Sequence, residues 1–250
     1  MLYQYVKAAP RALKPKKKAP MALSFVLMAA GFLVLTWVLW PIISFSVISD
    51  TLFAGIVAPV PDGHKEAVVG TGFLAPLALA AGDDSNSETS VDFTNANAWF
   101  PNKPQKKVVT PVNTYTLSIP KLKISGAAVV ISGDDLSKSL IHYGGTGLPG
   151  DYGTAVIFGH STLPQFFSPT NYKTIFSTLP TLVVGDEFFV TYDGVEYRYQ
   201  VHEMIVTEPT DLTPLEQHFD DSYITLITCV PPGTYWKRLN VRARLVRPAR

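Results

Sequence analysis

The chain of 250 residues carries 21 Lys and Arg against 20 Asp and Glu, and it contains a single cysteine, Cys229. A lone cysteine cannot form an internal disulfide, so the fold must be held together by a packed core rather than by cross-links. Six of the basic residues lie in the first 20 positions, which leaves 15 basic against 20 acidic residues in the remainder. This mildly acidic remainder argues against a nucleic-acid partner.

The first 48 residues have the pattern of a membrane anchor. Residues 1–20 are basic and contain no acid, and no charged residue occurs from position 19 to position 49. As a helix, the apolar stretch 21–40 would reach about 30 Å, close to the hydrocarbon thickness of a bilayer. We therefore predict a basic cytoplasmic tail over 1–20 and a transmembrane anchor over 21–48, in which Pro41 ends or kinks the helix.

The same pattern predicts the orientation of the anchor. Basic residues before a span favour a cytoplasmic N-terminus, and Trp37 and Trp40 suit the outer membrane interface. The expected protein crosses the plasma membrane once and holds everything after residue 50 outside the cell. Two alternatives are a cleaved signal peptide, whose apolar core is usually about 7–15 residues, and a buried helix of a soluble protein.

Residues 49–112 are predicted to be an extracellular stalk or linker. Six prolines interrupt this region, and residues 82–97 are polar and poor in aliphatic side chains. Such a composition cannot bury enough apolar surface to fold, so we expect part of the stalk to be disordered. The apolar patch over residues 73–81 is either a short helix or a segment on the membrane surface.

From about residue 113 the chain changes to short apolar or alternating runs that predict β-strands. Asp193 and Gly194 separate two of these runs, which is a strong hairpin signal. Short helical signals occur only at residues 134–140 and 172–179. We predict an all-β domain over 113–250, a closed barrel of about seven or eight strands. The predicted strands cover residues 115–119, 127–131, 154–158, 186–192, 196–206, 223–228 and 239–246.

Three reactive side chains are predicted to meet at one end of this barrel. Cys229 follows the strand 223–228, His160 follows the strand 154–158, and Arg238 begins the last strand. A cysteine nucleophile needs a base or a cation nearby, because the thiolate is the reactive form. Arg238 would supply fixed donors to a developing oxyanion or to a substrate backbone.

Each of these residues also has a purely structural interpretation. A lone cysteine at the end of a strand is most often a buried small hydrophobe, and His160 could simply complete a turn. His142 competes with His160 for the role of the base, whereas His64, His202 and His218 lie in the stalk, in a long strand and in a polar loop. Residue types alone therefore leave catalysis and plain packing both open.

Three separated motifs resemble the sortases, the membrane-anchored cysteine transpeptidases of bacterial surfaces. TLITC, ending at Cys229, matches their TLxTC signature. HYGGTGLPGDYGTAVIFGHS resembles the stretch leading to their catalytic histidine, and CVPPGTYWKRLNVRA resembles their cysteine-to-arginine loop. SIPKLKI resembles an early barrel segment, so the resemblance covers about residues 114–247. It implies the eight-stranded sortase barrel, with His160, Cys229 and Arg238 as the catalytic set.

The resemblance also implies a mechanism and partners. Cys229 would attack the threonine carbonyl of an LPXTG-like sorting signal on a surface protein, and His160, as an imidazolium paired with the thiolate, would protonate the leaving amine. Arg238 would stabilise the oxyanion or hold the peptide, and Thr228 matches the threonine before the nucleophile, a candidate for substrate binding. An amine from a cell-wall precursor or a pilin lysine would resolve the thioester. In sortases the motif position of His142 precedes the catalytic histidine, which favours a structural role.

Some features leave the subtype open. The Asp-Pro-aromatic lid motif of many pilin-type sortases is missing, although the nine-residue spacing from Cys229 to Arg238 resembles that group. Trp99, Phe100 and Pro101 lie where that lid would be; they either cover an apolar groove within a lid over 96–102 or, as the simpler interpretation, pack on the barrel. We expect no cofactor. Some sortases use calcium, but the acidic residues form no recognisable ligand motif: Asp134, Asp135, Glu187, Glu203 and Glu208.

Two alternatives to the sortase interpretation come from other classes of protein. One is an anchored extracellular β-domain that acts as a non-catalytic binding module, with Cys229 buried in its core. The other is a cysteine enzyme such as an L,D-transpeptidase, but its Ser-His-Gly-Cys type of motif does not occur in the sequence. The last strand is expected to have one buried and one wet face, with four basic residues on the wet side: Lys237, Arg242, Arg244 and Arg247.

Overall fold

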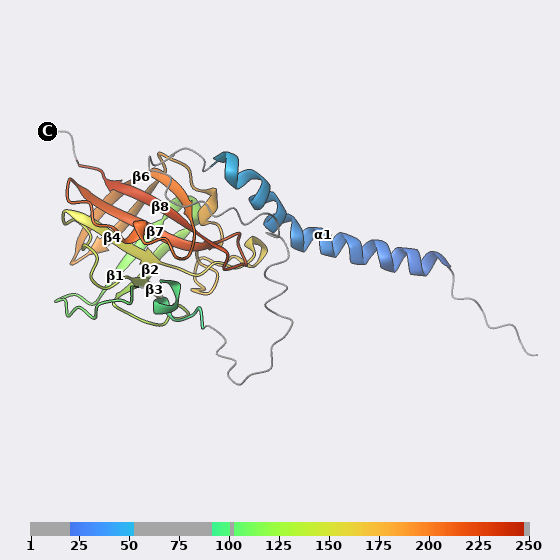
Figure 1. Cartoon of the computed structure of the whole chain (residues 1–250), viewed down its shortest axis with the longest axis horizontal. Helices are drawn as coiled ribbons and strands as arrows, with labels where there is room; N and C mark the ends of the chain where they lie inside the picture. Colours follow the sequence, from blue (N-terminus) through green and yellow to red (C-terminus); the bar gives the residue numbers. More distant parts are fainter. Residues whose placement is uncertain (1–20, 53–91, 101–102, 248–250) are drawn as a thin grey trace, which may run out of the picture. The chain divides into compact units, whose positions relative to one another are not determined.

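A computed structural model describes residues 21–52, 92–100 and 103–247 (Figure 1). The predicted cytoplasmic tail and most of the predicted stalk, including the patch 73–81, lie outside these residues. The chain forms two compact units, Met1–Trp40 and Pro41–Arg250.

One helix precedes the barrel, α1 (Met21–Leu52). Its stretch Leu23–Ile48 has 26 residues with a mean hydropathy of 2.3, which is long and apolar enough to cross a membrane. Pro41 lies inside the helix and does not end it, so the helix runs further than the 20-residue core of the prediction. Most described side chains of α1 are exposed, as expected for a helix whose apolar surface faces lipid.

Eight strands close into a barrel in the order β1-β2-β3-β4-β7-β8-β6-β5, which confirms the predicted fold class (Figure 1). Two neighbouring pairs, β2 with β3 and β4 with β7, are parallel, and the others are antiparallel. The strands are β1 (Thr114–Ile119), β2 (Ile124–Ile131), β3 (Leu140–His142), β4 (Gly153–Phe158), β5 (Glu187–Tyr192), β6 (Val195–Thr207), β7 (Ser222–Val230) and β8 (Lys237–Leu245).

The parallel pair β4 and β7 is buried on both faces, which explains its nearly continuous apolar sequence. Side chains such as Ile157 and Leu226 point into the barrel core. Their neighbours point outward into a second group of buried residues, here called the outer cluster. It consists of Ala96, Trp99, Phe100, Leu136, Ile141, Tyr143, Val156, Phe158, Leu215, Ile227 and Cys229. The nucleophile candidate therefore lies on the outer wall of the barrel, under a cover.

The predicted hairpin is present between β5 and β6. Tyr192 pairs with Val195, and both intervening residues have positive φ, 50° at Asp193 and 75° at Gly194. This is the backbone that a two-residue hairpin turn requires, and Asp-Gly adopts it with little strain.

The predicted helix over residues 134–140 is wrong. Asp135 instead forms a turn in which its carboxylate accepts hydrogen bonds from the backbone N–H and the hydroxyl of Ser137, at 2.9 and 2.6 Å. Such local bonds compete with helix formation. The chain then enters the short strand β3, which pairs in parallel with β2 and was not predicted.

The prediction of one wet face along β8 is also wrong in part. The side chains of Arg238 and Asn240 are 1% and 5% exposed, although they alternate with the core residues of the strand. Other chain segments cover this half of the outer face. Farther along, Arg242 pairs with Glu203 at 3.2 Å, and Arg244 and Arg247 both pair with Asp221.

Candidate active site

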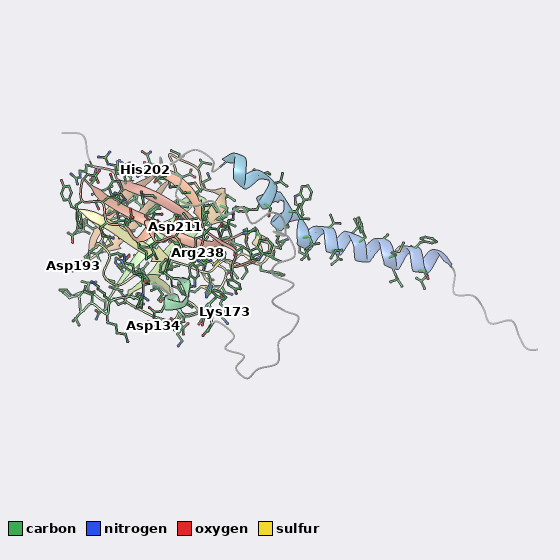
Figure 2. The ribbon with its side chains drawn as sticks, viewed as in Figure 1. Asp134, Lys173, Asp193, His202, Asp211 and Arg238 are labelled. Carbon is green, nitrogen blue, oxygen red and sulfur yellow. The ribbon has the colours of Figure 1, made fainter. Side chains whose placement is uncertain are left out.

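Cys229 and Arg238 face each other across two neighbouring strands. They are direct partners in the antiparallel register of β7 and β8, and Nη1 of Arg238 lies 3.5 Å from Sγ of Cys229. The same nitrogen donates to the backbone carbonyls of Tyr235 and Lys237, at 3.1 and 3.3 Å. The loop between the strands therefore fixes the guanidinium beside the sulfur. Figure 2 labels Arg238 among the strands of the barrel.

His160 follows β4, and Cys229 lies near the end of β7. Because these two strands are parallel, both residues lie at the same end of the barrel. Three hydrogen bonds join these chain ends: Gly159 N–H to the Ile227 carbonyl at 3.1 Å, Thr228 hydroxyl to the Gly159 carbonyl at 2.8 Å, and Ser161 hydroxyl to the Cys229 carbonyl at 2.6 Å. A Cβ at position 159 would lie 2.4 Å from the Phe176 ring, so only glycine fits there.

Thr228, the candidate for substrate binding, directly precedes Cys229 in β7. It is fully buried, and side-chain alternation along β7 turns it to the face opposite Cys229. Its hydroxyl holds the carbonyl of Gly159, next to His160. The structure thus gives Thr228 a positioning contact and does not bring its hydroxyl to the thiol.

Residues 92–100, here called the cover segment, lie over the three candidate residues. The Trp99 ring meets the His160 ring edge-on, with centroids 5.9 Å apart, and the Arg238 guanidinium lies 5.1 Å from the Trp99 centroid. Phe93 stacks on Tyr235 at 4.2 Å. Beneath this cover Cys229 is 1% exposed and His160 is 7% exposed. The Trp99 ring thus lies directly on the site, and simple packing on the barrel, the simpler interpretation of its sequence position, does not describe these contacts.

The cover segment is attached to the loop before β3. Ala96 N–H donates to the Asp134 carbonyl, and Leu136 N–H donates to the Thr94 carbonyl, both at 2.9 Å. The Asn97 side chain donates to the Asp134 carboxylate at 3.0 Å. This attachment explains why the residues 134–140 have a conformation of their own. The predicted lid extended to residue 102, and positions 101 and 102 lie outside the described residues.

Burial controls the protonation of the covered pair. It raises the pKa of Cys229 to about 11, although the charge of Arg238 acts in the opposite direction. Burial also lowers the pKa of His160, against the weaker pull of Asp92 and Asp135. The covered site therefore favours a neutral thiol and a neutral imidazole, rather than the imidazolium–thiolate pair that the sortase resemblance implies. No hydrogen bond links the two side chains within the described residues.

Two polar atoms of the site are buried without a hydrogen-bond partner among the described residues: Nε2 of His160 and Nε of Arg238. Arg238 also has no carboxylate partner in the part of the chain that the structure describes. A buried guanidinium without a counter-ion is costly, and proteins retain such groups mainly where a ligand or reaction uses them. The arrangement can thus present donors and a base to an incoming substrate beside a thiol.

The other histidines do not meet Cys229. His142 bonds through its ring nitrogens to the Tyr115 hydroxyl at 2.8 Å and the Thr146 hydroxyl at 3.1 Å, and burial lowers its pKa to about 4. His202 and His218 both contact the ring of Tyr223, near the opposite end of β7. His64 lies outside the described residues. These contacts favour His160 as the candidate base.

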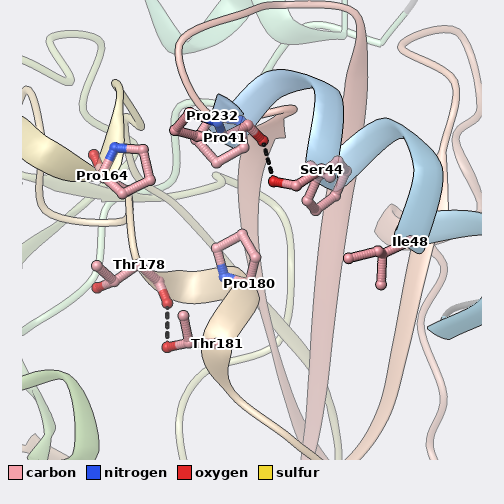
Figure 3. Close-up of a pocket in the computed structure, with 10 residues that line it drawn as sticks. Pro41, Ser44, Ile48, Pro164, Thr178, Pro180, Thr181 and Pro232 are labelled. Atoms are coloured by element: carbon pink, nitrogen blue, oxygen red, sulfur yellow. Dashed lines mark hydrogen bonds between the residues drawn. The ribbon is translucent and has the colours of Figure 1, made fainter. Parts of the chain in front are cut away.

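Neither a metal cluster nor a second reactive site was found in the described part of the chain. No three acidic, histidine or cysteine side chains gather there in a way that could hold a metal ion. Figure 3 shows an apolar pocket of about 260 Å³ within the unit Pro41–Arg250. Its lining holds no acidic, basic, histidine or cysteine side chain, and we assign it no function. It comprises Pro41, Ser44, Phe45, Ile48, Pro164, Ser177, Thr178, Pro180, Thr181 and Pro232.

Solved structures similar to this chain include three sortases. Sortase C-1 from Actinomyces oris is 30% identical (56% of this chain, 77% of that chain; TM-score 0.48). The Sortase D5 transpeptidase of Clostridium perfringens is 26% identical (56% and 83%; 0.47), and a lid mutant of sortase A from Corynebacterium diphtheriae is 27% identical (67% and 84%; 0.48).

No functionally curated protein matches the chain. The sortase domain model matches residues 117–246, which is more than half of the chain and includes Cys229, His160 and Arg238. The match lies inside the domain predicted over 113–250. It falls on the barrel that carries the thiol, the imidazole and the guanidinium at one end. The chain therefore belongs to the sortase family, whose members are in general cysteine transpeptidases.

Proposed function

We propose that this protein cleaves an LPXTG-like sorting signal through a thioester on Cys229 and transfers the cleaved surface protein to an amine of the cell wall or of a pilin. The observation that carries the proposal is the buried group around the sulfur. Nη1 of Arg238 lies 3.5 Å from Sγ of Cys229, and among the described residues Nε of Arg238 and Nε2 of His160 are buried without a hydrogen-bond partner. A plain core cysteine in a binding module would need neither, so this environment favours the enzyme over the binding module.

In the first half-reaction the thiol proton of Cys229 passes to His160, and Sγ attacks the threonine carbonyl of the sorting signal. Nη1 of Arg238, now 3.5 Å from the sulfur, is close enough to donate to the oxyanion that forms next to it. The tetrahedral adduct collapses as the peptide C–N bond breaks, and His160 gives the proton to the leaving amine. The products are a thioester and a free amine, with no net change in protons.

In the second half-reaction an acceptor amine attacks the thioester. A new C–N bond forms, the C–S bond breaks, and His160 carries the amine proton back to the thiolate. Division of the transfer into two steps is the advantage of a covalent intermediate. The apolar helix α1 would hold this chemistry at the outer face of the plasma membrane, where both substrates are confined to the same surface.

On this proposal the cover segment is a lid that must leave before a peptide can bind. Cys229 is almost wholly buried beneath it, so an acyl donor has no path to the sulfur while Trp99 is in place. Departure of the segment would also activate the nucleophile. Entry of water would remove the burial that raises the pKa of the thiol, while Arg238 would remain beside it and lower that pKa.

The test uses the full-length chain in detergent with a fluorescent LPXTG-type peptide. Intact-protein mass spectrometry should detect an acyl adduct, and added amines should convert it to a new peptide product. Cys229→Ala should abolish both adduct and cleavage, and Arg238→Lys should lower kcat by about 100-fold, because lysine keeps the charge but loses the planar fork of donors.

Cleavage that persists in Cys229→Ala would refute the mechanism. A folded wild-type protein without an adduct or cleavage, in which Cys229 reacts slowly with thiol reagents, would favour the non-catalytic binding module. A comparison of acceptors, a lysine peptide of the pilin type against a cell-wall stem peptide, identifies the amine that resolves the thioester.

A further inference from the structure

A second pocket, of about 160 Å³, lies at the far end of the outer cluster from Cys229. Two members of the outer cluster, Tyr143 and Leu215, form part of its wall. We call it the cationic pocket, because two lysines and no acidic residue line it. The lining residues are Lys103, Pro104, Lys106, Tyr143, Gly144, Gly145, Thr146, Leu215 and Gln217.

A continuous apolar path joins the sulfur to this pocket. Ile227 lies two residues before Cys229 on the same face of β7. Phe158, on the neighbouring strand β4, is the register partner of Ile227. The rings of Phe158 and Tyr143 are 5.1 Å apart, so the path reaches the wall of the pocket. Phe100 of the cover segment lies over it, 5.7 Å from Phe158. A peptide that displaces the cover segment would contact these apolar side chains in its place.

The length of the path fits an extended peptide of about six residues. Gln217, at the pocket, donates to the Thr154 carbonyl at 3.0 Å, so the pocket is level with the start of β4. His160 lies six positions farther along the same chain, a distance of about 20 Å at strand spacing. Four residues of a sorting motif would fill most of that path, and the pocket would receive the residue one or two positions before the motif.

The lysines that line the pocket are held by a fixed backbone. Lys106 N–H donates to the Gly144 carbonyl at 3.2 Å, and the Tyr143 hydroxyl donates to the Lys103 carbonyl. The Gln105 side chain accepts from Gly144 N–H at 3.0 Å and donates to the Gly133 carbonyl at 3.0 Å. A Cβ at position 144 would lie 2.1 Å from the Lys106 carbonyl oxygen, so the close approach requires glycine.

The described residues do not neutralise the charge of the pocket. No ion pair involves Lys103 or Lys106 among the described residues, whereas their neighbour Lys107 pairs with Asp134 at 3.9 Å. The remaining walls come from a tyrosine, a leucine, a proline, two glycines and two neutral polar residues, Thr146 and Gln217. Such a site complements a carboxylate on a short side chain, with electrostatic attraction supplying selectivity.

We propose that the cationic pocket is a specificity subsite that binds an acidic side chain just before the sorting motif. This inference rests on the proposed function. We place the substrate residues before the cleaved bond along the apolar path from Cys229 to the cationic pocket. Among the described strands, β4 and β7 form a wall only on this side of Cys229. Beyond Cys229 the strands β4 and β7 end at Phe158 and Val230, which leaves that side for the leaving peptide and the acceptor amine.

The experiment compares three peptides with one shared motif and Asp-Asp, Ser-Ser or Lys-Lys in the two positions before it. For the full-length chain in detergent we expect kcat/KM to fall in that order, by about threefold to tenfold per step at low salt, because partly exposed charge pairs are of modest strength. About 0.5 M NaCl should compress the series. In Lys103→Gln/Lys106→Gln the three values should converge, whereas the matched control Lys107→Gln should keep the order.

A fourth peptide, with Asp-Asp after the cleaved bond, should gain nothing over Ser-Ser. The subsite is overturned if wild type cleaves all the peptides equally, or if the order persists in Lys103→Gln/Lys106→Gln. Fluorescence anisotropy with Cys229→Ala measures peptide binding without turnover. If the Asp-Asp peptide binds more tightly but wild type cleaves no peptide, the subsite is upheld and the proposed transpeptidation is overturned. If wild type cleaves all peptides equally, the transpeptidation is upheld and the subsite is overturned.

Discussion

Arg238 is a buried cation that two different partners can stabilise. In the covered site its guanidinium lies over the Trp99 ring and beside the sulfur of Cys229. A cation–π contact is strongest when water is excluded, which is the situation at 1% exposure. When the cover segment leaves, the ring is lost and the thiolate or the oxyanion becomes the partner. The same side chain can therefore stabilise the closed site and serve the reaction.

His142 makes the stability of the barrel depend on pH. Burial lowers its pKa to about 4 in the folded protein, below the ordinary value of 6.5. The unfolded chain then binds more protons between these two values, so the free energy of unfolding is highest above pH 6.5 and falls as pH drops toward 4. The shift corresponds to a loss of up to about 3 kcal/mol.

Urea unfolding of the full-length chain, followed by tryptophan fluorescence from pH 7.5 to 4.5, measures this loss. In His142→Gln the slope with pH should become shallower, because the amide does not titrate. It should not vanish, since burial also lowers the pKa values of His160 and His202. An unchanged slope in His142→Gln would show that this imidazole does not control the dependence.

At the scale of elements, the cover segment and the loop between β7 and β8 are joined at the site. Phe93 stacks on Tyr235, and the carbonyl of Tyr235 accepts a hydrogen bond from Arg238. Movement of the segment would therefore remove an aromatic contact from the loop that holds the guanidinium. The short strand β3 contributes on the other side, because the loop before it bonds to residues 94, 96 and 97. Opening of the lid must break both attachments.

Trp99→Ala tests whether the cover segment restricts access to the site. The ring is fully buried between His160 and Arg238, so its loss should favour the open arrangement. We expect labelling of Cys229 by a thiol reagent at neutral pH and cleavage of a sorting peptide each to rise by about tenfold or more, because truncation of a buried tryptophan costs several kcal/mol.

Phe166→Ala, at an aromatic position that is 60% exposed, is the matched control and should leave both rates unchanged. Trp99→Ala should still unfold in a cooperative thermal transition, although at a lower temperature, since Trp99 belongs to the outer cluster and the barrel core is unchanged. If labelling and cleavage do not change in a folded Trp99→Ala protein, the segment is a packed part of the wall and not a lid.

At the scale of the whole molecule, the proposal needs the barrel outside the cell and the basic tail inside. The helix α1 supports a membrane anchor by its length and composition, and the six basic residues before it support the orientation. An extracellular barrel would meet its sorting signals and amine acceptors at the membrane surface. An intracellular barrel would meet neither.

Single cysteines in a Cys229→Ala background test this orientation. Phe219→Cys, at a position that is 70% exposed on the barrel, should react with a membrane-impermeant maleimide on intact bacterial cells. Lys16→Cys, in the basic tail, should react only after lysis. The reverse pattern would overturn the predicted topology, and labelling of both positions in intact cells would indicate that the chain does not remain a single-pass anchor.

The sequence by itself determined the features that depend on neighbouring residues. Short apolar or alternating runs predicted seven of the eight strands, Asp193 and Gly194 predicted the hairpin, and local motifs singled out His160, Cys229 and Arg238. Only the tertiary structure decided what covers the site. Trp99 and Arg238 are 139 positions apart in the sequence, and no local pattern encodes their contact. For the same reason β3 was missed, since three residues carry no period and depend on the strand beside them. Burial, which sets the protonation of the thiol, is a property of the closed assembly and not of any one segment.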